Sequence, residues 1–312
     1  VVIARDLVKQ TPENQQAGLL LAINSFEAGR YARAGRYLDK MQKGPMARLL
    51  EPNIRLWIAV AKARDEDVQA TISQLRRTAA FTPISMLQVA RALELSGDLT
   101  GADEAYETGA RAGGVSYFFF VKAYGAYLER KGDTRGAGKL YEDYNDTHLT
   151  HPHILAGLAR LETGAPAPEL PRAVNVQMAY AFFAVAEVME RESRLELALA
   201  YAHLALFLEP DSDIAMFMTA EMFGRNQNWA AAHDRFALIA PGQTMYRAAQ
   251  IKRAKMLNEA DAVEEAISVL YAVMTDTDED IEALVALGDM LRFRFRFEEA
   301  EQAYDKAIGR ID

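Results

Sequence analysis

The chain contains no cysteine among its 312 residues, which excludes disulfides, thiolate catalysis and cysteine-ligated metals together. No apolar run approaches the ~20 residues that a membrane-spanning helix needs, so no span is expected. Proline is sparse, at 10 residues, whereas good helix formers such as Ala, Leu, Glu and Arg abound. Positive charge is also scarce, because 35 Lys and Arg stand against 44 Asp and Glu. Since binding to phosphate backbones needs a positive field, nucleic acid is disfavoured as the main partner.

Motifs that would indicate an enzyme are missing as well. The sequence has no G-x-S-x-G elbow, no P-loop and no G-x-G-x-x-G stretch. In "HLTHPH", three imidazoles (His148, His151 and His153) could in principle hold zinc or copper. No acidic pattern completes such a site, and a polar loop between helices explains the histidines better. We predict a protein that is not an enzyme and has no cofactor and no metal.

A 34-residue periodicity organises the chain. Blocks that start at 179, 213, 247 and 281 follow one another without a gap, and each reads as a helix, a short polar break and a second helix. The eighth and twentieth residues of each block are small, which lets two antiparallel helices approach closely. Larger apolar residues at the eleventh and seventeenth positions are expected to be buried. The small residues are Ala186, Ala220, Ala254 and Gly288 at the eighth position, and Ala198, Ala232, Ala266 and Ala300 at the twentieth.

The N-terminal half follows the same frame less regularly, in the blocks 15–48, 83–116 and 118–151. The block 49–82 has the right length but carries Leu56 and Val68 at the small positions, so we interpret it as a degenerate repeat.

The Pro-rich segment 152–178 interrupts the array, and we predict an irregular joint there between sub-arrays at 15–151 and 179–312. Residues 1–14 are expected to hold the second helix of a truncated upstream repeat. The array is expected to continue beyond both ends.

This pattern resembles the tetratricopeptide repeat (TPR) family from end to end. The resemblance implies an all-α, right-handed superhelical solenoid whose concave face is lined by the first helix of each repeat. It also implies a scaffold that binds a protein or peptide segment in that groove. Phe119, in "SYFFFVKAYGAY", is expected to be exposed on the same face. Carried over from the family's contact positions, the other candidate residues are Tyr180, Phe183, Glu187, Arg191, Phe217, Glu221, Arg225, Ile251, Lys255, Asn258, Val285, Asp289 and Arg292.

More narrowly, "AEVMERESRLELALAYAHLALFLEPD" and "LGDMLRFRFRFEEAEQAYDKAI" resemble the long secreted TPR proteins of alphaproteobacteria. That resemblance implies a periplasmic scaffold that supports cell-envelope integrity, with the cytoplasm as the alternative location. Two other functions stay open. One is a periplasmic binder of a small molecule or glycan polymer, which a closed aromatic pocket near Phe119 and Tyr124 would favour. The other is the recognition module of a larger enzyme.

The stretch "LRFRFRFEEAEQAY" (291–304) alternates Phe and Arg, and by itself could be a strand or a nucleic-acid platform. In the frame that starts at 281 it spans the end of one helix, a turn and the start of the next. We therefore predict that Phe297 is buried, that Arg294 and Arg296 lie at a solvated turn, and that Arg292 points toward the groove.

Overall fold

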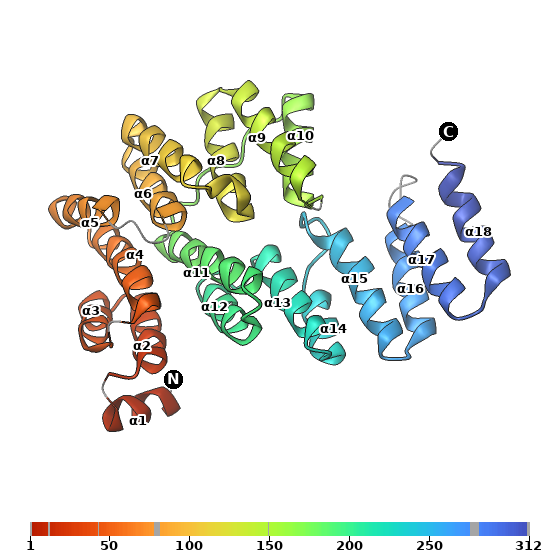
Figure 1. The fold of residues 1–312 in the computed structure, drawn as a ribbon, viewed down its shortest axis with the longest axis horizontal. Helices are drawn as coiled ribbons and strands as arrows, with labels where there is room; N and C mark the ends of the chain where they lie inside the picture. The colour runs from red at the N-terminus through yellow and green to blue at the C-terminus, as the bar shows by residue number, and fades with distance from the viewer. Residues whose placement is uncertain are drawn as a thin grey trace. The chain divides into compact units, whose positions relative to one another are not determined.

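The computed structural model describes residues 2–11, 13–42, 44–77, 82–148, 150–274 and 281–310. Over these ranges the chain forms eighteen α-helices and one short 3-10 helix, with no residue in a strand (Figure 1). The predicted all-α class is confirmed. None of these helices is long and apolar enough to cross a membrane. The last residues of the predicted blocks 49–82, 247–280 and 281–312 include positions outside the described ranges.

The helices are α1 Val2–Gln10, α2 Gln15–Glu27, α3 Tyr31–Lys40, α4 Pro45–Ala61, α5 Asp65–Arg77, α6 Thr82–Ser96, α7 Leu99–Arg111, η1 Gly114–Ser116, α8 Phe118–Lys131, α9 Thr134–Thr147, α10 Pro152–Thr163, α11 Val174–Arg191, α12 Leu195–Leu208, α13 Asp213–Arg225, α14 Trp229–Ala237, α15 Tyr246–Glu259, α16 Val263–Met274, α17 Ile281–Phe293 and α18 Phe297–Ile308.

The chain divides into two compact units, Val1–Pro210 and Asp211–Asp312, which we call unit 1 and unit 2. The predicted joint at 152–178 lies inside unit 1, where α10 fills its first part and α11 begins at Val174. Between these helices, residues 165–173 have no regular structure. The role of this segment as a hinge between sub-arrays stays a prediction.

One backbone feature recurs at the same place in all eight helix pairs. The turn inside each pair contains a residue with φ between 49° and 86°, and it is always the fifteenth of its block. Three of these positions hold glycine, which adopts left-handed backbone without a steric penalty. The block 49–82 shares this turn, so its frame matches its neighbours although its small residues are lost. The eight residues are Gly29, Ala63, Gly97, Gly132, Ser193, Gln227, Asp261 and Phe295.

The small positions lie where the two helices of a pair touch. Ala186 and Ala198 of the α11/α12 pair are fully buried, as are their equivalents in unit 2 apart from Ala300, which is 3% exposed. At Gly288, an added Cβ would lie 2.6 Å from the Tyr304 ring, so a larger residue requires that ring to move. Close approach of the paired helices therefore sets these positions, as predicted.

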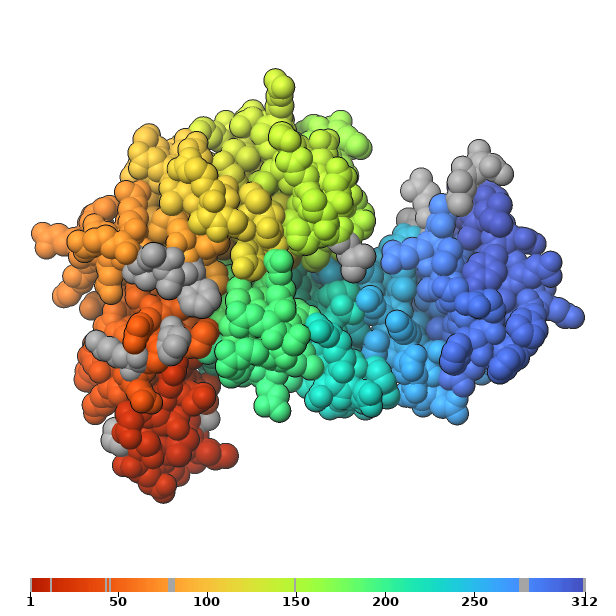
Figure 2. All heavy atoms as spheres, in the orientation of Figure 1, coloured from red at the N-terminus to blue at the C-terminus, as the bar shows by residue number. Residues whose placement is uncertain are grey.

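The first helix pair of the C-terminal sub-array, α11/α12, does not simply stack on its predecessor. One face of α11 packs on α12, and the other crosses α4, α6 and α8, the first helices of three earlier pairs. In Figure 2 the green atoms of α11 and α12 lie next to the orange and yellow atoms of those pairs. Most of α11 is consequently buried, including the polar side chain of Gln177. We call the α4, α6 and α8 surface the first-helix face of unit 1.

Candidate partner-binding site

The predicted groove residues of unit 1 are engaged within the unit, because Phe119 of α8 is covered by α11 and the other four lie on α11 and contact other parts of unit 1. Phe119, predicted to be exposed, is 1% exposed and stacks on Phe183 with ring centroids 5.0 Å apart and planes within 2°. Tyr180 meets both rings edge-on, at 6.1 and 6.2 Å. The prediction for Phe119 is wrong, since repeat frames assume stacking of neighbouring pairs and do not foresee a helix laid across the face.

Polar contacts complete this junction. The Arg91 guanidinium lies 3.8 Å from the centroid of the Tyr180 ring, and its Nε donates to Gln177 Oε1 over 2.6 Å. Lys122 Nζ donates to the Tyr180 hydroxyl over 2.8 Å. Burial acts to raise the pKa of Tyr180, but the nearby Lys122 and Arg91 charges outweigh it and lower that pKa overall. Both cations therefore contact α11 inside unit 1.

Glu187 and Arg191 fasten the other end of α11 to the start of α8. The Glu187 carboxylate accepts hydrogen bonds from the backbone nitrogens of Phe118, at 2.8 Å, and Phe119, at 3.4 Å. Burial raises the pKa of Glu187 to about 7, although both hydrogen bonds and Arg191 act to lower it. Arg191 Nη1 donates to the Ser116 carbonyl over 2.7 Å. Both side chains therefore join helices within unit 1.

Unit 2 presents its candidate residues differently. A pocket of about 420 Å³ lies between α15 and α17, the first helices of adjacent pairs. Its lining combines apolar side chains with charges of both signs, which suits an amphipathic ligand. Five of the predicted residues line it: Ile251, Lys255, Asn258, Asp289 and Arg292. The sequence analysis missed the others, which include Ala286, Met290 and Phe293.

The charges at this α15/α17 pocket are partly engaged. Lys252 Nζ lies 3.0 Å from Glu221 Oε1, and Arg292 Nη2 lies 3.8 Å from Asp289 Oδ1. Lys255 is exposed and forms no ion pair with any residue that the structure describes. A partner therefore meets one unengaged cation and one weakly paired cation beside an apolar floor.

The "RFRFRF" stretch departs from the prediction at Phe297. Phe293, Phe295 and Phe297 are 73%, 80% and 61% exposed, so Phe297 is not buried. The turn is left-handed at Phe295, whose φ is 60°, as at the same position of the other seven pairs. Phe295 and Phe297 pack on each other edge-on, with centroids 6.1 Å apart.

The arginines of the same stretch turn inward and join adjacent pairs. Arg294 Nε donates to the buried Asn258 Oδ1 over 3.0 Å, and its Nη1 donates to Asp261 over 2.6 Å. Arg296 Nη1 donates to Glu264, also over 2.6 Å. These two arginines lie at the solvated turn, as predicted, and are paired there with exposed acids of the preceding pair. Arg292 is the one that reaches the pocket.

The remaining candidates lie outside this pocket. Phe217 is half-buried and packs edge-on against Phe236, with centroids 5.3 Å apart. Glu221 holds Lys252, as described above. Arg225 and Val285 are exposed on α13 and α17.

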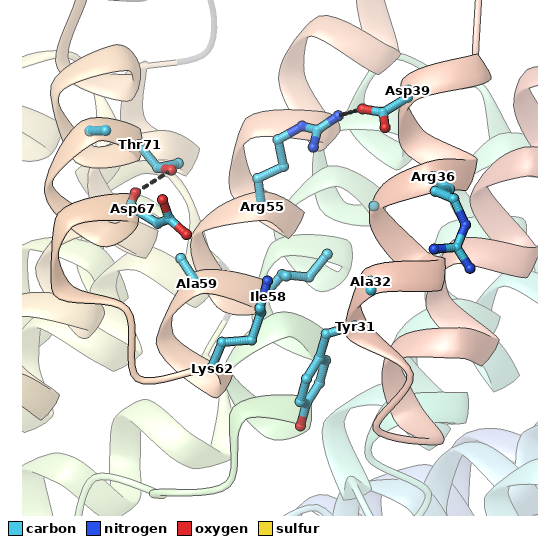
Figure 3. A pocket seen from close by; sticks show the side chains of 12 residues that line it. Tyr31, Ala32, Arg36, Asp39, Arg55, Ile58, Ala59, Lys62, Asp67 and Thr71 are labelled. Atoms are coloured by element: carbon cyan, nitrogen blue, oxygen red, sulfur yellow. Dashed lines mark hydrogen bonds and ion pairs between the residues drawn. The ribbon is translucent and has the colours of Figure 1, made fainter.

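Another pocket, of about 410 Å³, lies between α3, α4 and α5 in the degenerate part of the array (Figure 3). Its central cation is already neutralised, because Arg55 Nη2 lies 2.6 Å from Asp39 and 2.8 Å from Glu51. Burial acts to lower the pKa of Arg55, but both carboxylates outweigh it and raise that pKa. Small residues, Ala32 and Ala59 among them, form much of the wall.

The histidines of "HLTHPH" are occupied by aromatic contacts. His148 stacks on Tyr144 at 4.2 Å, and His151 stacks on Phe118 at 3.6 Å. Across the described ranges, no three His, Cys, Asp or Glu side chains are grouped so that they could hold a metal ion.

No protein-family model matches the chain, and no curated protein matches it. Solved structures do match. A chain of the APC/C hetero-tetramer Cut9–Hcn1 is 13% identical, with 99% of this chain and 75% of that chain covered and a TM-score of 0.41. The P58(IPK) TPR domain is 14% identical, with coverages of 93% and 91% and a TM-score of 0.28. The structure of Naa15/Naa10 bound to HypK contains a chain that is 16% identical, with coverages of 98% and 56% and a TM-score of 0.35.

All three TM-scores lie below 0.5, so the assignment of the fold rests on the helix pairs, their period and their shared turn. The fold is that of tetratricopeptide repeats. Our chain spans about half of the Naa15/Naa10 chain that it matches.

Proposed function

We propose that this TPR chain is a non-enzymatic scaffold that binds a segment of a partner protein at the α15/α17 pocket of unit 2. The observation that carries the proposal is the convergence of five predicted contact residues on one pocket. Its volume of about 420 Å³ lies within the range of typical ligand pockets. The apolar floor would take hydrophobic side chains, while Lys255 and Arg292 would take acidic ones.

Unit 1 contains an example of a helix bound to a surface of first helices, which supports the proposal. There the first-helix face holds α11, a helix that offers aromatic rings to α8 and polar groups to Arg91 and Lys122. This is helix-in-groove recognition within one chain. In unit 2 the corresponding helices are α13, α15 and α17, and a partner segment would occupy their surface in the same manner.

Site-specific photo-crosslinking tests the proposal. A photoreactive amino acid at position 255 lies at the pocket, whereas one at Ser268 lies on the exposed face of α16 and serves as the control. We expect one partner protein to be crosslinked from position 255 and not from 268. The same adduct from both positions, or from neither, would contradict the proposal.

Charge reversal provides the second arm. Lys255→Glu together with Arg292→Glu should weaken capture of that partner at least tenfold, which corresponds to about 1.4 kcal/mol. Lys306→Glu reverses an exposed cation on α18 and should leave capture unchanged. Circular dichroism must show equal helicity in all variants, because the altered side chains are exposed.

The cellular setting is proposed on the resemblance to secreted TPR proteins. We propose that the scaffold works in the bacterial periplasm and supports cell-envelope integrity. Alkaline phosphatase fused to the natural full-length protein should then be active, and loss of the gene should sensitise cells to detergent. An inactive fusion beside an active cytoplasmic reporter would instead favour the cytoplasm.

The alternative function, binding of a small molecule or glycan, would be favoured by a closed aromatic pocket near Phe119 and Tyr124, but both rings pack against other rings of the protein. Phe119 is covered by Phe183, and Tyr124 stacks on Tyr106 at 4.9 Å with planes within 9°. These faces are therefore filled by the protein's own rings. The alternative of a recognition module in a larger enzyme stays a prediction, which the full-length sequence would decide.

A further inference from the structure

A second apolar cavity lies within unit 1, between α2 and α12, and has a volume of about 420 Å³. Leucines from both helices form its walls, and α4 contributes one methionine. Polar side chains stand at its margin. The lining residues are Gln15, Gln16, Leu19, Leu20, Met46, Arg194, Leu197, Ala200, Tyr201, His203 and Leu204.

The facing helix surfaces explain why this space stays open. In the TPR pairs, fully buried alanines at the eighth and twentieth positions let helices close on each other. Here the residues that face each other include Leu20, Leu197 and Leu204, which are all only half-buried. Apolar side chains therefore line a space that no other described side chain fills, and such surface favours an apolar ligand.

The cavity has one cationic end. Its wall on α12 runs from Arg194 to Leu204, roughly 15 Å at the helical rise per residue. Arg194 is the N-cap of α12, is exposed, and pairs with no acidic side chain among the described residues. No side chain caps this helix start, and the acidic residue of its first turn, Glu196, does not line the cavity, so Arg194 is the charged group at this end.

We propose that the α2/α12 cavity binds a small amphiphile, with an alkyl chain along the leucines and an anionic head at Arg194. The volume lies in the range of ligand sites that are mostly apolar with a few polar groups. The anionic head would pair with Arg194, and the alkyl chain would lie along the leucines of α2 and α12. This site differs from the α15/α17 pocket both in place and in the class of ligand.

Calorimetric titration with sodium dodecanoate, kept below its micelle concentration, tests the proposal. Dodecyl maltoside and dodecyltrimethylammonium carry the same chain with neutral and cationic heads. We expect saturable one-to-one binding of dodecanoate, weaker binding of the maltoside and the weakest binding of the cation. No saturable binding of dodecanoate, or equal affinity for all three heads, would overturn the proposal.

Two variants locate the site. Ala200→Trp places a large ring in the cavity from an exposed helix position, and should abolish dodecanoate binding with helicity preserved. Arg194→Gln should weaken dodecanoate roughly two- to fivefold, as loss of an exposed ion pair predicts, and leave the maltoside unchanged. The matched control, Ala32→Trp, fills the α3/α4/α5 pocket and should bind as the wild type does. Unchanged binding by Ala200→Trp would place the ligand elsewhere and refute the assignment.

Discussion

Replacing Glu187 by Gln would change how the stability of unit 1 depends on pH. The carboxylate of Glu187 meets the first two backbone nitrogens of α8, at 2.8 and 3.4 Å. Part of the residue reaches the surface, but burial of the carboxylate still raises its pKa to about 7, from an ordinary value of 4.5. Gln keeps an oxygen for the shorter hydrogen bond and carries no charge at any pH.

The sign follows from proton binding. Between the unfolded pKa near 4.5 and the folded pKa near 7, the folded protein holds a proton that the unfolded chain has lost. The free energy of unfolding of the wild type therefore falls as pH rises through this window, and is level above it. A shift of this size is worth roughly 3 kcal/mol at most. Loss of the longer hydrogen bond in Glu187→Gln costs about 1 kcal/mol.

We therefore expect Glu187→Gln to match or fall slightly below the wild type at pH 5, and to exceed it by roughly 1 to 2 kcal/mol at pH 8. Urea unfolding measures this. The chain has two Trp, so in a Trp229→Phe background the fluorescence of buried Trp57 reports on unit 1 alone.

The quantity to compare is the free energy of unfolding of the variant minus that of the wild type at each pH, because groups that titrate alike in both proteins cancel in this difference. Glu196→Gln, at an exposed carboxylate on α12, is the control and should give a flat difference. A flat difference for Glu187→Gln would refute the reasoning, as would greater instability at pH 8 than at pH 5.

Three changes in unit 2 test its packing, each by urea unfolding in a Trp57→Phe background, where the fluorescence comes from Trp229 alone. Gly288→Val should cost about 1 to 3 kcal/mol, because a Cβ there would lie 2.6 Å from the Tyr304 ring. Phe295→Gly should stabilise by about 0.5 kcal/mol, since an 80%-exposed side chain is lost and left-handed strain is relieved. Arg294→Met should cost about 1 to 3 kcal/mol, because buried Asn258 Oδ1 loses its donor.

The three predictions share one control variant, and a different result would contradict each of them. Arg292→Met removes an exposed cation from the same stretch and should stay within about 0.5 kcal/mol of the wild type. A tolerated Gly288→Val would mean that α17 and α18 are further apart than described. A destabilising Phe295→Gly would show that the exposed ring contributes packing, and an Arg294→Met no worse than the Arg292 control would remove Arg294 as a link between pairs.

The helix pairs could be predicted from the sequence because their cause is local. Small residues at two positions of each block report helix contacts within about 34 residues of chain, so the pattern survives without tertiary information. The path of α11 could not be predicted in this way. It depends on nine residues, 165–173, that have no regular structure and leave the direction of the following helix open. Thus Phe119 and Phe183 were assigned to a groove that α11 itself fills.

The "RFRFRF" stretch was misjudged for a different reason, and the sequence held a signal that could have corrected it. The position of Phe297 in its repeat predicts that its side chain is buried in the core. The position in the repeat does not determine which of two neighbouring side chains forms an ion pair with the adjacent helix pair. Arg294 finds Asp261, 33 residues earlier, and Arg296 finds Glu264, 32 residues earlier.

Both separations are close to the repeat period, so the opposite charges occupy the facing turns of successive pairs. The arginines reach back to these acids, and the phenylalanines beside them are exposed. In TPR chains, opposite charges spaced by about one period at the turn therefore predict inward arginines, and aromatic residues between them predict an exposed surface.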